Sequence, residues 1–197
     1  MQESREIFLS ILKKLLEWDV RMSEAIRISP EKKHIWKISV FFAHSGDSWY
    51  WLAGLFPIWI ISIFLSPQWH RISGILAFSL LIEAALILAV KFVVRRRRPE
   101  GEWGEIYRNT DPHSFPSGHA ARMALIALMS WGIAPLWFAI LLTIWTPLVC
   151  IARVIMGVHY WSDVVVGVII GLMSGWLMLI WVPVFVPFIN TFIPFAF

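Results

Sequence analysis

The chain has 197 residues, of which 58% are apolar and 15% are charged, and its mean hydropathy is +0.70. Soluble domains usually contain about 45–50% apolar and about 25% charged residues, so this composition excludes an ordinary soluble globule, a disordered chain and a disulfide scaffold, and it predicts a polytopic membrane protein. The net charge of +4 comes from basic residues beside apolar segments, which favours membrane lipids and phosphorylated lipids over nucleic acid as partners.

Residues 1–34 form the only long hydrophilic stretch, and apolar residues recur in it at near-helical spacing between charged ones. The pattern predicts an amphipathic helix that lies on the membrane or over the bundle. No apolar core with a small-residue cleavage site follows the start of the chain, so we expect no cleaved signal peptide.

The remainder of the chain is expected to be an all-α transmembrane bundle over residues 35–182, followed by an apolar tail over 183–197. With about 20 apolar residues for each span, the sequence predicts about five spans, or six if the N-terminal segment also crosses the membrane. The expected spans are 37–65, with a polar notch at 44–48, then 72–94, 117–131, 136–152 and 161–182.

Short polar or glycine-containing segments separate these spans. We expect a turn at 67–71, a hydrophilic loop at 99–116 that contains Gly101, Gly104 and Asp111, a tight turn at 132–135 and a break near Gly157. The tail is expected to be irregular or interfacial because it contains three prolines.

Three glycines mark one face of the last expected span. Gly167, Gly171 and Gly175 lie four residues apart, a spacing that lets helix backbones approach closely. We favour packing inside the bundle over a dimer contact for this face, and the oligomeric state is not encoded in these residues.

Polar side chains beside the expected spans fall into three sets. Such residues usually mark function because charges are costly in a bilayer. With antiparallel spans, the end of the second, the start of the third and the end of the fourth share one membrane face. We therefore expect the sets to meet, and they are Lys91 with Arg98, then Ser117, Gly118 and His119, and then Arg153, His159 and Asp163.

The first two sets are suited to binding phosphate. Lys91 and Arg98 are nearly in register on a helix, so an ammonium and a forked guanidinium can face the same oxygens. Ser117 and Gly118 begin a helix, where free backbone N–H groups bind anions. Arg153 would add a third cation.

The remaining residues are suited to phosphoryl transfer. His159 and Asp163 are four residues apart on one helical face, so the carboxylate can hold one ring nitrogen and leave the other as a nucleophile, while His119 can transfer a proton. A metal site that adds Asp111 is the alternative. Three cations would repel a metal ion, so we expect neither a metal nor a cofactor.

At these positions the sequence resembles the type 2 phosphatidic acid phosphatase family, the metal-independent membrane lipid phosphatases. The family pattern stands here as KFVVRRRRP at 91–99, PSGH at 116–119 and ARVIMGVHYWSD at 152–163, with Ala152 in place of the usual Ser. The resemblance implies that the phosphate is bound by Lys91, Arg98, Ser117, Gly118 and Arg153.

The resemblance also implies the catalytic roles and the substrate class. His159 would attack phosphorus to give a phosphohistidine, Asp163 would orient it and His119 would protonate the leaving oxygen. We favour a polyprenyl diphosphate such as undecaprenyl diphosphate as substrate, then phosphatidylglycerophosphate or phosphatidate. Vanadium haloperoxidases resemble the same motifs but are soluble, and a non-enzymatic lipid-phosphate binding or transport protein is the alternative.

Other polar residues carry weaker expectations. Glu83 is predicted to hydrogen-bond a neighbouring helix rather than line a lipid groove, whereas Asp47 is equally suited to contact substrate or to cap the first span. His113 is expected to be a loop residue. Arg95–Arg97 are expected either to bind anionic headgroups or to stop the helix and set topology, and we favour the second role for at least two of them.

Orientation is predicted from the distribution of basic residues. The N-terminal segment, Arg95–Arg97 and Arg108 crowd the side that holds the expected site, and the opposite side offers little beyond Arg71. The positive-inside rule therefore favours a site that faces the cytoplasm, in a bacterial or archaeal cytoplasmic membrane.

Overall fold

The computed structural model describes residues 2–29, 31–100, 111–193, 195 and 197. In that part of the chain every regular element is a helix, apart from one isolated bridge between Arg97 and His113. The all-α prediction is therefore confirmed. The expected loop at 99–116 is described only in part, because 101–110, with Gly101, Gly104 and Arg108, lies outside the described residues.

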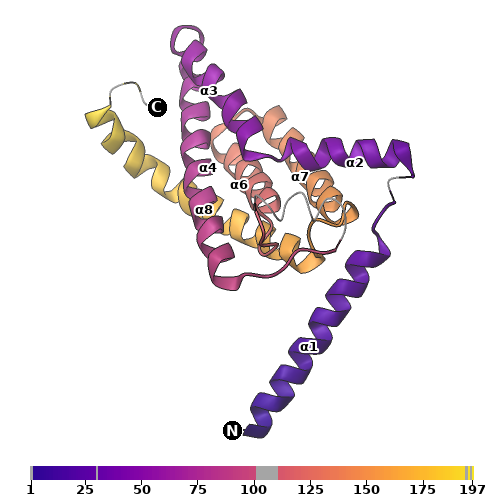
Figure 1. The fold of residues 1–197 in the computed structure, drawn as a ribbon. Coiled ribbons are helices and arrows are strands. Elements are labelled where there is room, and N and C mark those ends of the chain that lie inside the picture. Colours follow the sequence, from indigo (N-terminus) through magenta and orange to yellow (C-terminus); the bar gives the residue numbers. More distant parts are fainter. Residues whose placement is uncertain (1, 30, 101–110, 194, 196) are drawn as a thin grey trace.

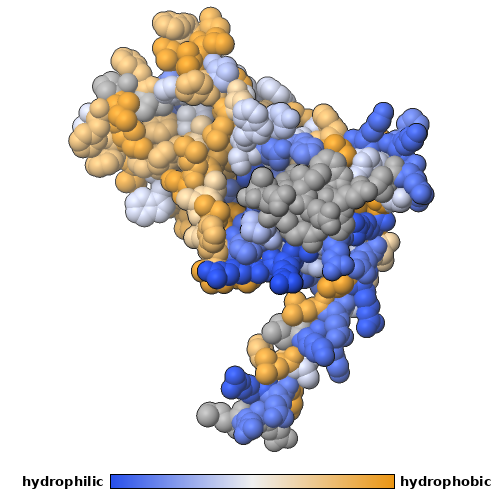
Figure 2. Space-filling model, viewed as in Figure 1, coloured by the Kyte–Doolittle hydropathy of each residue, from blue (hydrophilic) through white to orange (hydrophobic). Residues whose placement is uncertain are grey.

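The helices in chain order are α1 (Gln2–Ala25), α2 (Lys33–Ser45), α3 (Ser48–Leu65), α4 (Pro67–Val94), α6 (Gly118–Ile133), α7 (Leu136–Ile155) and α8 (Trp161–Phe192). α6 packs against α4, α7 and α8, while α3 packs along α4 and α2 along α7, and α1 extends away from the bundle (Figure 1). Four of the described helices, α3, α4, α7 and α8, are long and apolar enough to cross a membrane. Figure 2 shows apolar surface around α3 and the C-terminal part of α8 and hydrophilic surface around α2 and the end of α4, while α1 exposes both kinds of side chain.

The first expected span is wrong, because residues 37–65 form two helices rather than one. The chain bends at Gly46 and Asp47, between α2 and α3. The Gly46 carbonyl accepts a hydrogen bond from Arg122 of α6, and a Cβ at Gly46 would lie 2.8 Å from Val149 Cγ1 of α7. The polar notch thus ends α2 and turns the chain into α3, because side chains of two other helices hold the backbone there.

The turn expected at 67–71 is also wrong, because these residues form the first turn of α4. Ser66 precedes the helix and its Oγ accepts a hydrogen bond from Trp69 N at 3.4 Å. Pro67 occupies a starting position, where its missing N–H removes no helical hydrogen bond. The tight connection between α3 and α4 is therefore the single residue Ser66.

The expected irregular tail is wrong over most of its length, since α8 continues through Pro183 and Pro187 to Phe192. Each proline removes one helical hydrogen bond. Val182 and Val186 are buried in the main hydrophobic core, and this packing holds the helix together across both prolines. The helix of the last expected span therefore continues ten residues beyond 182.

The glycine face of α8 packs against α6, as predicted for an intramolecular contact. A Cβ at Gly171 would lie 2.0 Å from Ala121 O, and one at Gly167 would lie 2.5 Å from Ser117 O. This close approach places the start of α8 beside the start of α6, where Ser117 N donates a hydrogen bond to Asp163 O at 2.9 Å. Helix packing therefore brings two of the three polar sets together.

Candidate active site

The three polar sets meet at one end of the bundle, as the antiparallel spans predict. Arg98, just after α4, donates from Nη1 to Val158 O at 2.9 Å, in the turn between α7 and α8. That turn contains Gly157, whose φ of 65° suits glycine because it lies in the left-handed region. Arg153 at the end of α7 is buried, with 1% of its surface exposed. The ends of α4 and α7 and the starts of α6 and α8 thus build the site.

Lys91 and Arg98 converge on the carboxylate of Asp111. Lys91 Nζ and Arg98 Nη2 both donate to Asp111 Oδ2, the latter at 2.8 Å, and Arg98 Nε donates to Asp111 O at 2.7 Å. Burial acts to raise the pKa of Asp111, but the charge and hydrogen bond of Lys91 and the charge of Arg98 outweigh burial and lower it. The ionised carboxylate therefore occupies an anion position between two cations, which the sequence did not reveal.

His159 is buried between a cation and a carboxylate. Its Nε2 accepts a hydrogen bond from Arg98 Nη1 at 3.2 Å, and its Nδ1 lies 3.6 Å from Asp163 Oδ2. This pairing assigns the ring proton to Nδ1 and the lone pair to Nε2. Burial, with the charges of Arg98 and Arg153, lowers the pKa of His159 to about 3, against the opposing hydrogen bond and charge of Asp163. The imidazole is therefore neutral at physiological pH.

Asp163 is fully buried and held through both oxygens. Oδ2 accepts a hydrogen bond from Tyr160 N at 3.0 Å, and Oδ1 accepts one from Arg96 Nη1 at 2.7 Å. Sequence reasoning assigned Arg96 with its neighbours to headgroups or topology. Only the hydrogen bond to Asp163 distinguishes Arg96 from Arg95 and Arg97. In the sequence all three belong to one run of arginines, so the pattern of residues does not single out Arg96.

His119 pairs with Asp47 at the bend between α2 and α3. Its Nε2 lies against Asp47 Oδ1, and Asp47 Oδ2 lies 3.0 Å from His44 Nδ1. The Asp47 side chain makes no capping hydrogen bond to α3. Of the two roles open for Asp47, the capping role is therefore wrong, and its partner is a predicted catalytic residue.

The start of α6 leaves polar groups available for an anion. Ser117 is fully buried, and its Oγ has no hydrogen-bond partner among the described residues. Gly118 opens the helix and lines a cavity of about 400 Å³ together with Lys91, Asp111, His119 and other residues. Ile87, Leu88 and Phe92 form an apolar wall of the same cavity. The site thus joins a charged end to an apolar surface, and His113 lines it as well.

Glu83 does not make the predicted hydrogen bond. It is 1% exposed, and neither carboxylate oxygen has a hydrogen-bond partner within the described part of the chain. Arg122 of α6 is close enough to attract it electrostatically. Glu83 therefore lies beside a neighbouring helix, as expected, but without the predicted hydrogen bond among the described residues.

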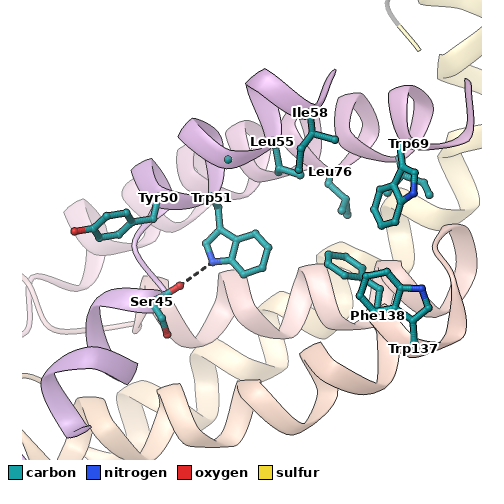
Figure 3. Close-up of a pocket in the computed structure, with 11 residues that line it drawn as sticks. Ser45, Tyr50, Trp51, Leu55, Ile58, Trp69, Leu76, Trp137 and Phe138 are labelled. Atoms are coloured by element: carbon teal, nitrogen blue, oxygen red, sulfur yellow. Dashed lines mark hydrogen bonds between the residues drawn. The ribbon is translucent and has the colours of Figure 1, made fainter. Parts of the chain in front are cut away.

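A second cavity of about 390 Å³ lies among α3, α4 and α7 (Figure 3). Its lining is mostly apolar and aromatic, and Trp51 lies toward one end while Trp69 and Phe138 lie toward the other. Trp51 Nε1 donates to Ser45 O at 2.9 Å. Because Ser45 lines this cavity and Asp47 lines the charged one, both cavities reach the bend between α2 and α3.

The described residues contain no group of three or more His, Cys, Asp and Glu side chains placed to hold a metal ion. The cavity of about 400 Å³ is instead lined by the cations Lys91 and Arg122 together with His119, and Arg98 contacts His159 beside it. This donor set suits an anion better than a cation. Metal independence stays a prediction.

The family model of the PAP2 superfamily matches residues 73–187. The chain is 35% identical over 92 residues to a decaprenylphosphoryl-5-phosphoribose phosphatase of Mycobacterium tuberculosis. The aligned region covers 46% of this chain and 50% of that protein. It is 29% identical over 138 residues to an undecaprenyl-diphosphatase of Sulfolobus acidocaldarius. This aligned region covers 68% of this chain and 64% of that protein. The chain thus spans about half to under two thirds of the length of these relatives.

Two solved structures share the fold. A transmembrane PAP2-type phosphatidylglycerolphosphate phosphatase from Bacillus subtilis superposes with a TM-score of 0.67 at 23% identity, covering 84% of both chains. LpxE of Aquifex aeolicus superposes with a TM-score of 0.61 at 24% identity, covering 81% of this chain and 93% of that one. This likeness shows the fold, and four of the described helices are long and apolar enough to cross a membrane.

Proposed function

Because the chain belongs to the PAP2 superfamily, we propose that it is an integral-membrane lipid phosphatase that works through a phosphohistidine. The observation that carries the proposal is the position of His159, with Nδ1 toward Asp163 and the Nε2 lone pair beside the Arg98 guanidinium. A nucleophile held by a base and placed at an anion site is the arrangement that nucleophilic phosphoryl transfer requires.

In this proposal the substrate phosphate displaces the Asp111 carboxylate. Lys91 and Arg98 then bind the phosphate oxygens, and Arg153 adds positive charge from α7. The backbone N–H groups at the start of α6 and the Ser117 hydroxyl, which has no hydrogen-bond partner among the described residues, complete the anion site. Preorganised donors of this kind stabilise the charge that develops during transfer.

The proposed reaction has two steps. His159 Nε2 attacks phosphorus, the bond from phosphorus to the leaving oxygen breaks, and His119 donates a proton to that oxygen. A water molecule then attacks the phosphohistidine and gives its proton to His119, which lost its own in the first step. The P–N bond breaks and inorganic phosphate leaves. Asp163 stabilises the charge on the His159 ring and keeps its proton on Nδ1.

We propose a lipid phosphate or diphosphate as substrate, with a polyprenyl diphosphate such as undecaprenyl diphosphate favoured and phosphatidylglycerophosphate or phosphatidate next. Two relatives, named above, act on polyprenyl-linked phosphates. The apolar cavity of Figure 3 offers a place for the lipid chain next to the site.

The function is tested by phosphate release from a panel of lipid phosphates, with detergent-purified protein and EDTA present. We expect activity in the wild type, none in His159→Ala and full activity in the matched control His34→Ala, whose side chain is exposed on α2. Labelled phosphate should be trapped on the wild type only. Unchanged activity in His159→Ala would reject the nucleophile, and lipid binding without phosphate release would favour the binding or transport alternative.

The lipid-chain site is tested at Gly54, which lines the apolar cavity and where a Cβ would meet nothing within 4 Å. Gly54→Phe fills this space, so activity on long-chain substrates should fall about tenfold while activity on short-chain soluble phosphates stays unchanged. Ile61→Phe, on the same helix with 56% exposure, is the matched control. Equal losses for both chain lengths would reject this site.

A further inference from the structure

The start of α8, which carries Asp163, is capped by side chains of α1. Trp161 N donates to Ser23 Oγ at 3.0 Å, and Ser162 N donates to Asp19 Oδ1 at 2.9 Å. The first N–H groups of a helix have no hydrogen-bond acceptors within that helix. The side chains of Ser23 and Asp19 supply acceptors for two of these N–H groups. Asp19 and Ser23 are both 5% exposed. A buried contact thus joins two segments that lie far apart in the sequence.

Asp19 also continues into the active site through Arg96. Arg96 Nη2 donates to Asp19 Oδ2 at 2.8 Å, and Arg96 Nη1 donates to Asp163 Oδ1 at 2.7 Å. The same Nη1 lies 2.6 Å from Ser162 Oγ. One guanidinium therefore bridges the carboxylate of α1 and the carboxylate that faces His159.

This bridge to Oδ1, together with the Tyr160 N–H on Oδ2, fixes the rotation of the Asp163 carboxylate. Oδ1 is held by Arg96, so Oδ2 is the oxygen directed toward Nδ1 of His159. The guanidinium is planar, which makes its own orientation depend on the second contact, with Asp19. The Tyr160 ring, 4.0 Å below the Arg96 Cζ, restricts it further. Asp19 therefore acts on the nucleophile through two intervening side chains.

We propose that Asp19 and Arg96 are positioning residues that hold Asp163 in the orientation needed to keep His159 ready for attack, so that α1 completes the active site. This inference rests on the proposed function, and neither residue touches the substrate. The described side chains of α1 from Gln2 to Trp18 are exposed, so its last turns make this contact (Figure 1).

The first test separates catalysis from binding. The amide of Asp19→Asn has one oxygen, so it can accept from Arg96 or from Ser162 N but not from both. Because Asp163 is then held less firmly, kcat should fall about tenfold while KM stays unchanged. Arg96→Lys keeps the charge but cannot bridge two carboxylates, and it should lose a similar factor. Glu17→Gln, an equal charge change on the exposed face of α1, should keep the wild-type kcat. Equal kcat in Asp19→Asn and the wild type would overturn the proposal.

The second test is a double-mutant cycle with Asp163→Asn. If Asp19 acts through Asp163, then Asp19→Asn should cost no further activity once Asp163 is replaced. A merely structural role predicts that the two losses multiply, and that result would also overturn the proposal. Thermal unfolding of each variant in detergent identifies any that fail to fold, and Arg96→Lys then replaces Asp19→Asn in the cycle.

A third measurement does not depend on enzymatic activity. In protein labelled with ¹⁵N-histidine, the Nδ1 signal of His159 reports its interaction with Asp163 and is identified by its loss in His159→Gln. We expect Asp19→Asn to shift this signal and Glu17→Gln to leave it unchanged. An unshifted signal would overturn the positioning role. Absence of phosphate release by the wild type would reject the proposed function alone, since the NMR signal still decides the inference.

Discussion

At the scale of single residues, Asp111 occupies the position proposed for the substrate phosphate. Its carboxylate forms ion pairs with Lys91 and Arg98, the two cations proposed to bind phosphate. A carboxylate and a phosphate have similar charge and hydrogen-bonding geometry, so they compete for these donors. Substrate binding then includes the exchange of one anion for another.

Asp111→Asn should therefore tighten the binding of inorganic phosphate. The amide keeps the shape of the side chain but removes the competing charge, so the inhibition constant for phosphate should fall about tenfold. Competition assays with the purified protein measure it. Glu100→Gln, at an exposed position near the same loop, is the control and should have no effect. Weaker phosphate binding in Asp111→Asn would contradict the assignment.

The buried His159 imidazole should make stability depend on pH. Its pKa is about 3 in the folded protein and about 6.5 when unfolded, so the unfolded chain binds a proton between these values and the folded chain does not. Stability from this group is complete above pH 6.5 and falls as pH decreases toward 3. Thermal unfolding in detergent from pH 7 to 4 should show a shallower decline in His159→Gln than in the wild type.

The control for this pH series is His34→Gln, which removes an exposed histidine from α2. It should keep the wild-type slope of unfolding temperature against pH. Identical slopes in wild type and His159→Gln would mean that the imidazole is accessible to protons in the folded state. The neutral nucleophile proposed above would then lose its support.

At the scale of helices, the contact between α6 and α8 positions the site. Gly171→Ala would place a Cβ 2.0 Å from Ala121 O, so the helices must separate. We expect a loss of about 3 kcal/mol, or roughly 6–12 °C in Tm, with reduced activity because Ser117 and Asp163 lie on the two helices. Thermal unfolding and phosphate release measure both effects.

Substitutions at two other glycines test whether the loss of stability follows the size of the steric clash. Gly175→Ala places its Cβ 3.2 Å from Leu125 O and should cost less, and Gly54→Ala meets no atom within 4 Å and should leave Tm within about 2 °C. Equal Tm values across the three variants would show that close backbone approach does not limit this helix pair.

Helix boundaries were predicted well where apolar runs ended in charged or turn residues. The expected spans at 117–131 and 136–152 correspond to α6 and α7 within a few residues. The bend at Gly46 and the continuation of α8 past Pro183 were not predicted. Both depend on contacts with other helices, whereas hydropathy registers only how apolar a segment is.

At the scale of the whole molecule, the distribution of charge predicts that the site faces the cytoplasm. In a Cys150→Ala background, Glu100→Cys labels the end of α4 near the site, and Gln68→Cys labels the other end of the same helix. Both side chains are exposed. A membrane-impermeant maleimide should modify Gln68→Cys in intact cells and Glu100→Cys only after lysis.

The opposite labelling pattern would place the site on the outer face. Phosphate release by each cysteine variant is the control, because both positions lie outside the catalytic set and should keep wild-type activity. The result also constrains the lipid, since substrate and site must share a leaflet.

The sequence by itself determined the all-helical class, the helices that correspond to α6 and α7, and the three polar sets that meet at one end of the bundle. These follow from apolar run length, helical periodicity and motif spacing, which are properties of local segments. Only the tertiary structure decided that Asp111 fills the anion position, that Asp47 pairs with His119 and that Arg96 joins α1 to the buried carboxylate of α8. Each of these pairs joins residues far apart in the sequence, and several similar charged residues compete for each position. Which charges come within hydrogen-bond distance depends on how α4, α6, α7 and α8 pack.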